Sequence, residues 1–137
     1  SALEGVPMMR QLIGVGLFSL VMCLVVSGPA SSHHSHAMFD YGQKISITGN
    51  VTEFTFRNPH GFLFVDVEEE DGEVVNYWIE LGPIPAMIQR GILYKTFVPG
   101  DLITVSMYPL KDGRPGGNHS SIVGADGRTY AGRPPAD

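Results

Sequence analysis

The sequence predicts a mainly β protein: a small five-stranded barrel of the OB type, with one short helix between strands three and four and a hydrophobic leader helix ahead of it. Three observations predict this class. Short runs alternate between apolar and polar residues, Gly, Pro, Asn and Asp separate these runs, and only one segment after the leader has helical spacing. The order strand, strand, strand, helix, strand, strand is that of the OB barrel. A small sandwich with a similar number of strands is the alternative.

The first strand is expected to start near Ile45 and to change its inward face. The apolar residues of 45–51 share one parity, whereas Phe54 and Phe56 share the other. Gly49 lies close to this change, and a strand that switches faces near a glycine is typical of a bulge or a sharp coil. After this strand, a tight turn is predicted at Asn58-Pro59-His60-Gly61.

A hairpin is expected next. Leu63, Val65 and Val67 share one face of the second strand, and apolar residues alternate through 75–81 in the third. The Asp71-Gly72 pair between them suits a hairpin turn. Gly82-Pro83 ends the third strand, because proline has no N–H to donate to the ladder.

The single helix of the barrel is predicted over residues 84–90. Its apolar residues have i, i+3, i+4 spacing, prolines stand at its start, and Gly91 suits the residue after its end. A turn at Pro99-Gly100-Asp101 follows. Alternating apolar residues over 103–107 then predict the fourth strand.

The rest of the chain has weaker patterns. Residues 109–118 are rich in Gly and Pro and predict a loop, 119–124 a fifth strand, and Thr129-Tyr130 a last paired stretch. We therefore expect the barrel domain to cover residues 44–131. Residues 132–137 are expected to be a frayed tail.

Residues 1–30 are expected to be a signal peptide. Arg10 precedes an uncharged apolar run, Leu12 to Val26, and small residues follow as far as Ala30. The run is shorter than the roughly 18 apolar residues of a typical spanning helix. We favour cleavage after Ala30 over cleavage after Ala37. The expected location is the periplasm, with membrane anchoring only if the leader is retained.

Composition argues against several classes of function. The formal charge of -5 is unsuited to nucleic-acid phosphates. The single cysteine, Cys23, lies in the expected leader, so no disulfide framework and no multi-cysteine zinc site can form. The sequence has no Gly-x-Ser-x-Gly elbow, Gly-rich phosphate loop or His-Glu-x-x-His pair. We therefore favour a function that is not enzymatic.

Residues 31–43 form a polar, histidine-rich arm that is expected to be a loop. After cleavage at residue 30, His33 would be the third residue of the chain. The terminal amine, two backbone amides and this imidazole could then form a planar set of four nitrogens, which favours Cu(II) or Ni(II). His34 and His36 add imidazoles, and Met38 adds a thioether suited to Cu(I). The competing interpretation, which we favour for the arm taken by itself, is an exposed polar linker, or a segment that is removed if cleavage occurs after Ala37.

His60 and His119 are weaker candidates. In an OB barrel, His60 lies in the loop between strands one and two, and His119 closes the loop between strands four and five. These loops flank the usual ligand face of the fold, so the two histidines could complete a metal site with the arm. The alternative, which we favour, is a tight turn in which the Asn58 and His60 side chains bond backbone groups.

Trp78 and Glu80 share the outer face of the predicted third strand, with Phe62 or Phe64 nearby. An exposed aromatic patch of this kind could hold a protein partner. The alternative, which we favour, is that Trp78 packs under the helix or the arm. The acidic run 68–71 lacks the spacing of a calcium loop and is expected to be a solvated hairpin tip.

Several short motifs occur in a fixed order along the chain. They are His33-His34-Ser35-His36-Ala37-Met38-Phe39-Asp40, Asn58-Pro59-His60, Trp78-Ile79-Glu80-Leu81-Gly82, Arg90-Gly91, Pro99-Gly100-Asp101 and Lys111-Asp112-Gly113. From about His33 to Tyr130, the chain resembles a family of small exported bacterial proteins of unknown function, which have a His-His-Ser-x-Ala-Met-Phe-Asp start and an Asn-Pro-His motif. The resemblance implies a secreted, mainly periplasmic protein with one β-rich domain. It assigns no activity and no site residue.

Taken together, these observations predict an exported periplasmic binding module whose candidate ligand is copper or another transition metal. The candidate metal ligands are His33, His34, His36, Met38, His60 and His119. The alternative is an accessory or structural subunit that docks on a membrane or periplasmic complex, with the leader retained as an anchor. Its contact would be the Trp78 face. No nucleic-acid partner and no other cofactor is expected.

Overall fold

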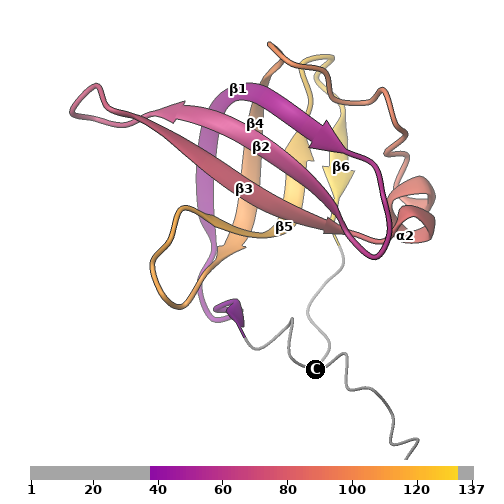
Figure 1. Ribbon diagram of the computed structural model, residues 1–137, viewed down its shortest axis with the longest axis horizontal. Coiled ribbons are helices and arrows are strands. Elements are labelled where there is room, and N and C mark those ends of the chain that lie inside the picture. The colour runs from indigo at the N-terminus through magenta and orange to yellow at the C-terminus, as the bar shows by residue number, and fades with distance from the viewer. Residues whose placement is uncertain (1–37, 133–137) are drawn as a thin grey trace, which may run out of the picture. The chain divides into compact units, whose positions relative to one another are not determined.

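The computed structural model describes residues 38–132, which form a closed five-stranded barrel with one short helix (Figure 1). The elements are β1 (Ile45–Thr55), β2 (Gly61–Glu68), β3 (Val74–Gly82), α2 (Ile84–Gln89), β4 (Leu102–Pro109), β5 (Gly116–Val123) and β6 (Thr129–Ala131). Neighbouring strands follow the order β3-β2-β1-β4-β5, and a parallel pairing of β3 with β5 closes the ring. The OB-type prediction is confirmed. The expected leader, the arm histidines at 33, 34 and 36, and residues 133–137 lie outside the described residues.

Strand β1 belongs to both halves of the barrel. It pairs with β4 over Ile45–Asn50 and with β2 over Asn50–Thr55, and the register shifts between Val51 and Glu53. Figure 1 shows the resulting bend. A Cβ atom on Gly49 would collide with the carbonyl group of Asp66, so the glycine lets β2 approach closely. The predicted change of face is therefore confirmed, with the bulge just after Gly49.

The parallel contact that closes the barrel is short and depends on glycine. It pairs Trp78 with Gly116, Ile79 with Gly117, and Glu80 with Asn118. A Cβ atom on Gly116 would lie 2.5 Å from the Trp78 carbonyl oxygen, so a side chain there would push β5 away from β3. Strand β5 thus begins at Gly116, earlier than the predicted residue 119. The pattern missed this start because Gly and Asn carry no apolar alternation.

The main core combines inward side chains of the five barrel strands with residues of α2, of the segment after it and of β6. Its buried members are Val51, Leu63, Val65, Val67, Ile79, Leu81, Met87, Ile92, Phe97, Ile103, Val105, Met107, Ile122 and Tyr130. The predicted helix is confirmed as α2, and it contributes Met87 to this core. Within residues 38–132, no helix is long and apolar enough to cross a membrane.

A second, smaller cluster lies outside the barrel and involves the end of the arm. It consists of Phe39, Tyr108 and Leu110, with Met38, Tyr41 and Trp78 packed against it. The Asp40 N–H donates to the Pro109 carbonyl at 2.8 Å, and the Lys111 N–H donates to the Met38 carbonyl at 2.9 Å. The arm therefore joins the fold from Met38 onward. The sequence pattern could not show this, because Met38 and Phe39 are only two adjacent apolar residues and show no alternation that would predict a strand.

Replacing Phe39 tests whether the arm end belongs to the fold. Phe39 is 1% exposed, so Phe39→Ala should reduce the free energy of unfolding by about 3–5 kcal/mol. Its ring packs against Trp78, the single tryptophan of the chain, so urea unfolding can be followed by tryptophan fluorescence. The control is Tyr94→Ala at a 66% exposed residue, with an expected change within about 0.5 kcal/mol. Equal stability of the two variants would contradict the packing of Phe39.

Candidate functional site

The candidate site lies on the outer face of the β2–β3 hairpin, where a loop and the arm end cover the sheet. On β3, Ile79 and Leu81 point into the core, so the alternation turns Trp78 and Glu80 outward. Phe62 stands opposite Glu80 on β2 and shares this face. Glu80 is nevertheless only 7% exposed. A carboxylate covered to this extent needs a polar partner.

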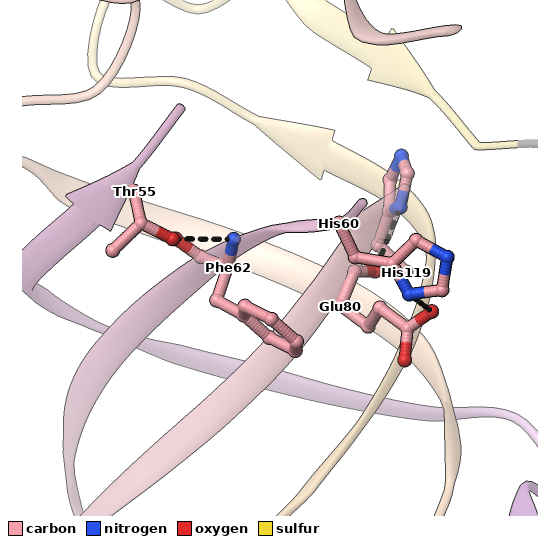
Figure 2. A network of polar contacts seen from close by, with 5 residues as sticks. All are labelled: Thr55, His60, Phe62, Glu80 and His119. Carbon is pink, nitrogen blue, oxygen red and sulfur yellow. Dashed lines mark hydrogen bonds and ion pairs between the residues drawn. The ribbon is translucent and has the colours of Figure 1, made fainter. Parts of the chain in front are cut away.

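His60 is the partner of the Glu80 carboxylate. Its Nδ1 atom lies 2.7 Å from Glu80 Oε1, and the two side chains are 32% and 9% exposed, respectively (Figure 2). His60 occupies the loop between β1 and β2, as predicted. We favoured a tight turn in which the Asn58 and His60 side chains bond backbone groups, and this holds for Asn58 only. The Ile84 N–H donates to Asn58 Oδ1 at 2.9 Å, whereas the His60 side chain bonds a carboxylate.

His119 lies within β5 and not at the end of the β4–β5 loop, which corrects the position expected from the sequence. It pairs with Met107, a core residue, so its side chain also points into the barrel. The residue is 2% exposed, and its Nδ1 lies 3.2 Å from the Glu80 carbonyl oxygen. Its Nε2 is buried, with no hydrogen-bond partner among the described residues.

The two histidines therefore meet the same residue from different sides. Figure 2 shows one imidazole at the Glu80 carboxylate and the other at its backbone carbonyl. The His60 ring faces the outside of the sheet and the His119 ring faces the barrel interior. The two rings therefore do not face a common ion. Within residues 38–132, no group of three or more His, Cys, Asp or Glu side chains is placed to hold a metal ion.

An aromatic row brings the arm end to the same face. Ring centroids are 5.0 Å apart for Tyr108 and Tyr41, 6.3 Å for Tyr41 and Phe39, and 6.3 Å for Phe39 and Trp78. Phe62 continues the row at 6.0 Å from Trp78. Trp78 therefore packs under the arm, and the alternative favoured from the sequence is confirmed.

Tyr41 links this aromatic row to the carboxylate. Burial raises the pKa of its phenol, and the negative charge of Glu80 raises it further. The phenol therefore remains protonated at neutral pH. The end of the arm lies close enough to Glu80 for the two groups to interact electrostatically.

A hollow of about 320 Å³ occurs elsewhere on the barrel, lined in part by Glu69, Tyr77 and Arg114. The polar side chains at its rim bond one another or their neighbours. Tyr77 donates to Glu69 at 3.0 Å, and Arg114 Nε lies 2.8 Å from Asp112. No histidine is among the described residues that line this hollow, in contrast to the His60–Glu80 face.

Sequence reasoning placed Glu80 on the right face but missed its bond to His60. The predicted two-residue turn at Asp71-Gly72 would pair Phe62 with Leu81. The structure pairs Phe62 with Glu80, because the loop is one residue longer and the Glu69 N–H donates to the Glu73 carbonyl. The usable signal was the parity of the apolar residues, since Leu63 and Ile79 can share the inner face only if odd residues pair with odd residues.

Comparison with known families gives one result. Residues 21–119 match the family described as "Family of unknown function (DUF6152)". The matched region includes His60, Glu80 and His119, and it also covers the histidine-rich arm. A search of the curated proteins found no match.

The burial of His119 predicts a loss of stability in acid. Burial lowers the pKa of His119 to about 4, the charge of Arg90 also lowers it, and the Glu80 carbonyl acts in the opposite direction. In the unfolded chain the imidazole has a pKa of about 6.5. Between these values the unfolded state binds more protons. The neutral imidazole of His119 therefore makes its full contribution to the free energy of unfolding above about pH 6.5. This contribution is lost as the pH falls towards 4, and the total loss is on the order of 3 kcal/mol.

Urea unfolding between pH 7.5 and 4.5 measures this loss. His119→Gln should show a smaller decrease than the wild type, because it removes the buried titrating group. An NMR titration of His119 in the wild type gives its pKa directly, so the test does not depend on the variant folding. An imidazole that titrates near pH 6.5 would contradict the prediction.

Proposed function

Because the chain belongs to this family of unknown function, we propose its function from its own residues: it is an exported, periplasmic binding module for a transition-metal ion, with copper as the preferred ligand. The observation that carries the proposal is the fixed end of the histidine-rich arm. Phe39 is buried, and backbone hydrogen bonds on both sides of it tie the arm to Pro109 and Lys111.

This attachment limits how far the arm histidines can lie from the barrel. Each residue of an extended chain spans at most about 3.6 Å, so the backbone of His36 is tethered within about 11 Å of Phe39. Phe39 contacts Trp78, which shares the outer face of β3 with Glu80. The described end of the arm therefore packs against a residue of the face that carries Glu80.

The donor set favours copper. His33, His34 and His36 supply imidazoles, and cleavage at residue 30 would add the terminal amine and two backbone amides. A nitrogen-rich tetragonal set suits Cu(II). Met38 carries a soft thioether, and its side chain is packed against the Phe39 cluster. His119 is not part of the proposed set, because its imidazole points into the core.

The described residues hold no group of three or more His, Cys, Asp or Glu side chains placed to bind a metal ion, so the proposal takes its ligands from the arm. Trp78, the expected contact of a docking subunit, is packed against Phe39 and Phe62. The docking alternative therefore gains no support from this face. Export is proposed from the leader pattern, and the only cysteine falls within that leader.

Copper titration of the naturally exported protein tests the proposal. Mass spectrometry should find Ser31 at the amino terminus, and calorimetry should find one tightly bound Cu(II), with an EPR spectrum of a nitrogen-rich tetragonal site. Replacing His33, His34 and His36 together with alanine should weaken binding at least 100-fold, because it removes the imidazole donors. The matched control replaces Ser31, Ser32 and Ser35 with alanine and should leave affinity unchanged. Equal affinity of both triple variants would refute arm-based binding.

A further inference from the structure

We propose that one end of the barrel docks on an anionic lipid surface through the loop that follows α2. The loop consists of residues 93–96, in which Leu93 and Tyr94 are 52% and 66% exposed. Ile88 on α2 and Val98 just after the loop are also exposed. We call these four apolar residues the lipid-binding end. The inference uses only residues of the barrel and does not depend on the proposed metal binding.

The loop has a fixed shape. The Leu93 N–H donates to Thr96 Oγ1 at 2.7 Å, and the Thr96 N–H donates to the Leu93 carbonyl at 2.9 Å. Ile92 before the loop and Phe97 after it are both buried in the main core. Leu93 and Tyr94 therefore project into solvent from a loop that is anchored on both sides. Large apolar side chains held outward in this way gain free energy when a partner surface removes them from water.

The charge of this end is opposite to that of the chain as a whole. The net charge is -5, but residues 81–100 contain no Asp or Glu, and their charged residues are Arg90 and Lys95. The turn between β5 and β6 adds Arg128, whose Nη2 atom would lie 3.8 Å from a Cβ atom on Gly91. Cations beside exposed apolar side chains suit an anionic lipid surface, because they attract the phosphates while the apolar groups enter the interface.

Tyr94 and Lys95 together fit the boundary between lipid headgroups and acyl chains. The Lys95 ammonium lies over the Tyr94 ring, with Nζ 5.4 Å from the ring centroid. Tyrosine combines an apolar ring with a polar hydroxyl, and such rings are enriched where a membrane meets water. The neighbouring ammonium is placed to meet a phosphate when the ring enters the interface.

Two carboxylates border this end, and each bonds a backbone group. Asp101 accepts from the Val98 N–H at 3.1 Å, and Asp126 accepts from the Arg128 N–H at 3.0 Å. These carboxylates shape the two turns. They stand outside the stretch 81–100 that carries the exposed apolar residues.

The opposite end of the barrel is acidic, which orients the molecule on such a surface. The tip of the β2–β3 hairpin carries Glu68, Glu69, Glu70, Asp71 and Glu73. Figure 1 shows this tip and α2 at opposite ends of the barrel, joined by β3. The nine residues of β3 span roughly 30 Å. This distance is several Debye lengths at physiological ionic strength, so the acidic tip does not cancel the attraction at the other end.

An acidic tip from a second copy of the chain fits the same cations less well. Residues 68–73 consist of carboxylates and one glycine. They offer no apolar side chain to cover Leu93 and Tyr94, whereas a lipid surface provides both phosphates and an apolar interior.

Vesicle sedimentation tests the inference with the exported protein. The protein should bind vesicles of equal parts phosphatidylglycerol and phosphatidylcholine at least about tenfold more tightly than pure phosphatidylcholine vesicles. Raising NaCl from about 0.1 M to about 0.5 M should weaken binding to the anionic vesicles, because salt screens the attraction. Absence of binding to the anionic vesicles, or equal binding to both kinds, would overturn the inference.

Variants assign the binding to the loop. The double variant Leu93→Ala with Tyr94→Ala, and the single variant Lys95→Glu, should each weaken binding to the anionic vesicles about tenfold or more. The matched controls are Val74→Ala, at a 59% exposed residue of the acidic end, and Lys111→Glu, in the β4–β5 loop. Both controls should bind like the wild type, and circular dichroism establishes that every variant is folded.

All variants share one amino terminus, so any binding by the leader would be the same in each of them. Equal binding by the loop variants and the controls would therefore assign the attraction to another part of the chain and contradict the inference.

Sedimentation velocity without vesicles distinguishes lipid from a second copy of the chain. The wild type and Lys95→Glu should have the same sedimentation coefficient at all protein concentrations. Self-association that Lys95→Glu abolishes would assign this end to a protein contact and refute lipid docking. Copper binding enters neither measurement, so the proposed function and this inference can fail independently.

Discussion

The architecture depends on the close parallel approach of β5 to β3. Gly116 has no side chain, and this allows β5 to approach Trp78 and to close the barrel. The next residue, Gly117, allows the close approach of β5 to Tyr108 of β4 on the other side. The parallel pairing places Asn118 beside Glu80 and turns the next residue, His119, into the core. Outside the barrel, Trp78 and Tyr108 pack with Phe39 of the arm end. The barrel closure and the arm attachment therefore share Trp78, which pairs with Gly116 through its backbone and contacts Phe39 through its ring.

The buried Glu80 carboxylate follows from this arrangement. Its position on β3 points outward, where a glutamate would normally be solvated. The loop and the arm end cover that face, so the carboxylate loses most of its contact with water. Desolvation of this kind is tolerated only with a strong hydrogen-bond partner. His60 provides that partner at 2.7 Å, and the structure thereby fixes one histidine that a flexible loop would leave free to rotate.

The sequence predicted the parts of the fold that depend on periodicity. Alternation identified β2 and β3, parity switching identified the bend of β1, and i, i+3, i+4 spacing identified α2. Contacts between distant segments left no periodic pattern. Phe39 packs against Trp78 across a long sequence separation, and the start of β5 consists of two glycines and an asparagine. For the candidate site, the sequence supplied His60 and His119. The hydrogen bond from His60 to Glu80 required the hairpin register.

The environments of His60 and His119 assign them different chemistry. The interior deprives His119 of water and lowers its pKa, so this imidazole stays neutral, and its Nε2 is enclosed by the barrel. His60 combines partial exposure with a carboxylate at Nδ1, so solvent reaches this ring while its orientation is fixed. Glu80 therefore contacts two imidazoles in different ways, one through its carboxylate at the outside of the barrel and the other through its backbone carbonyl on the interior side.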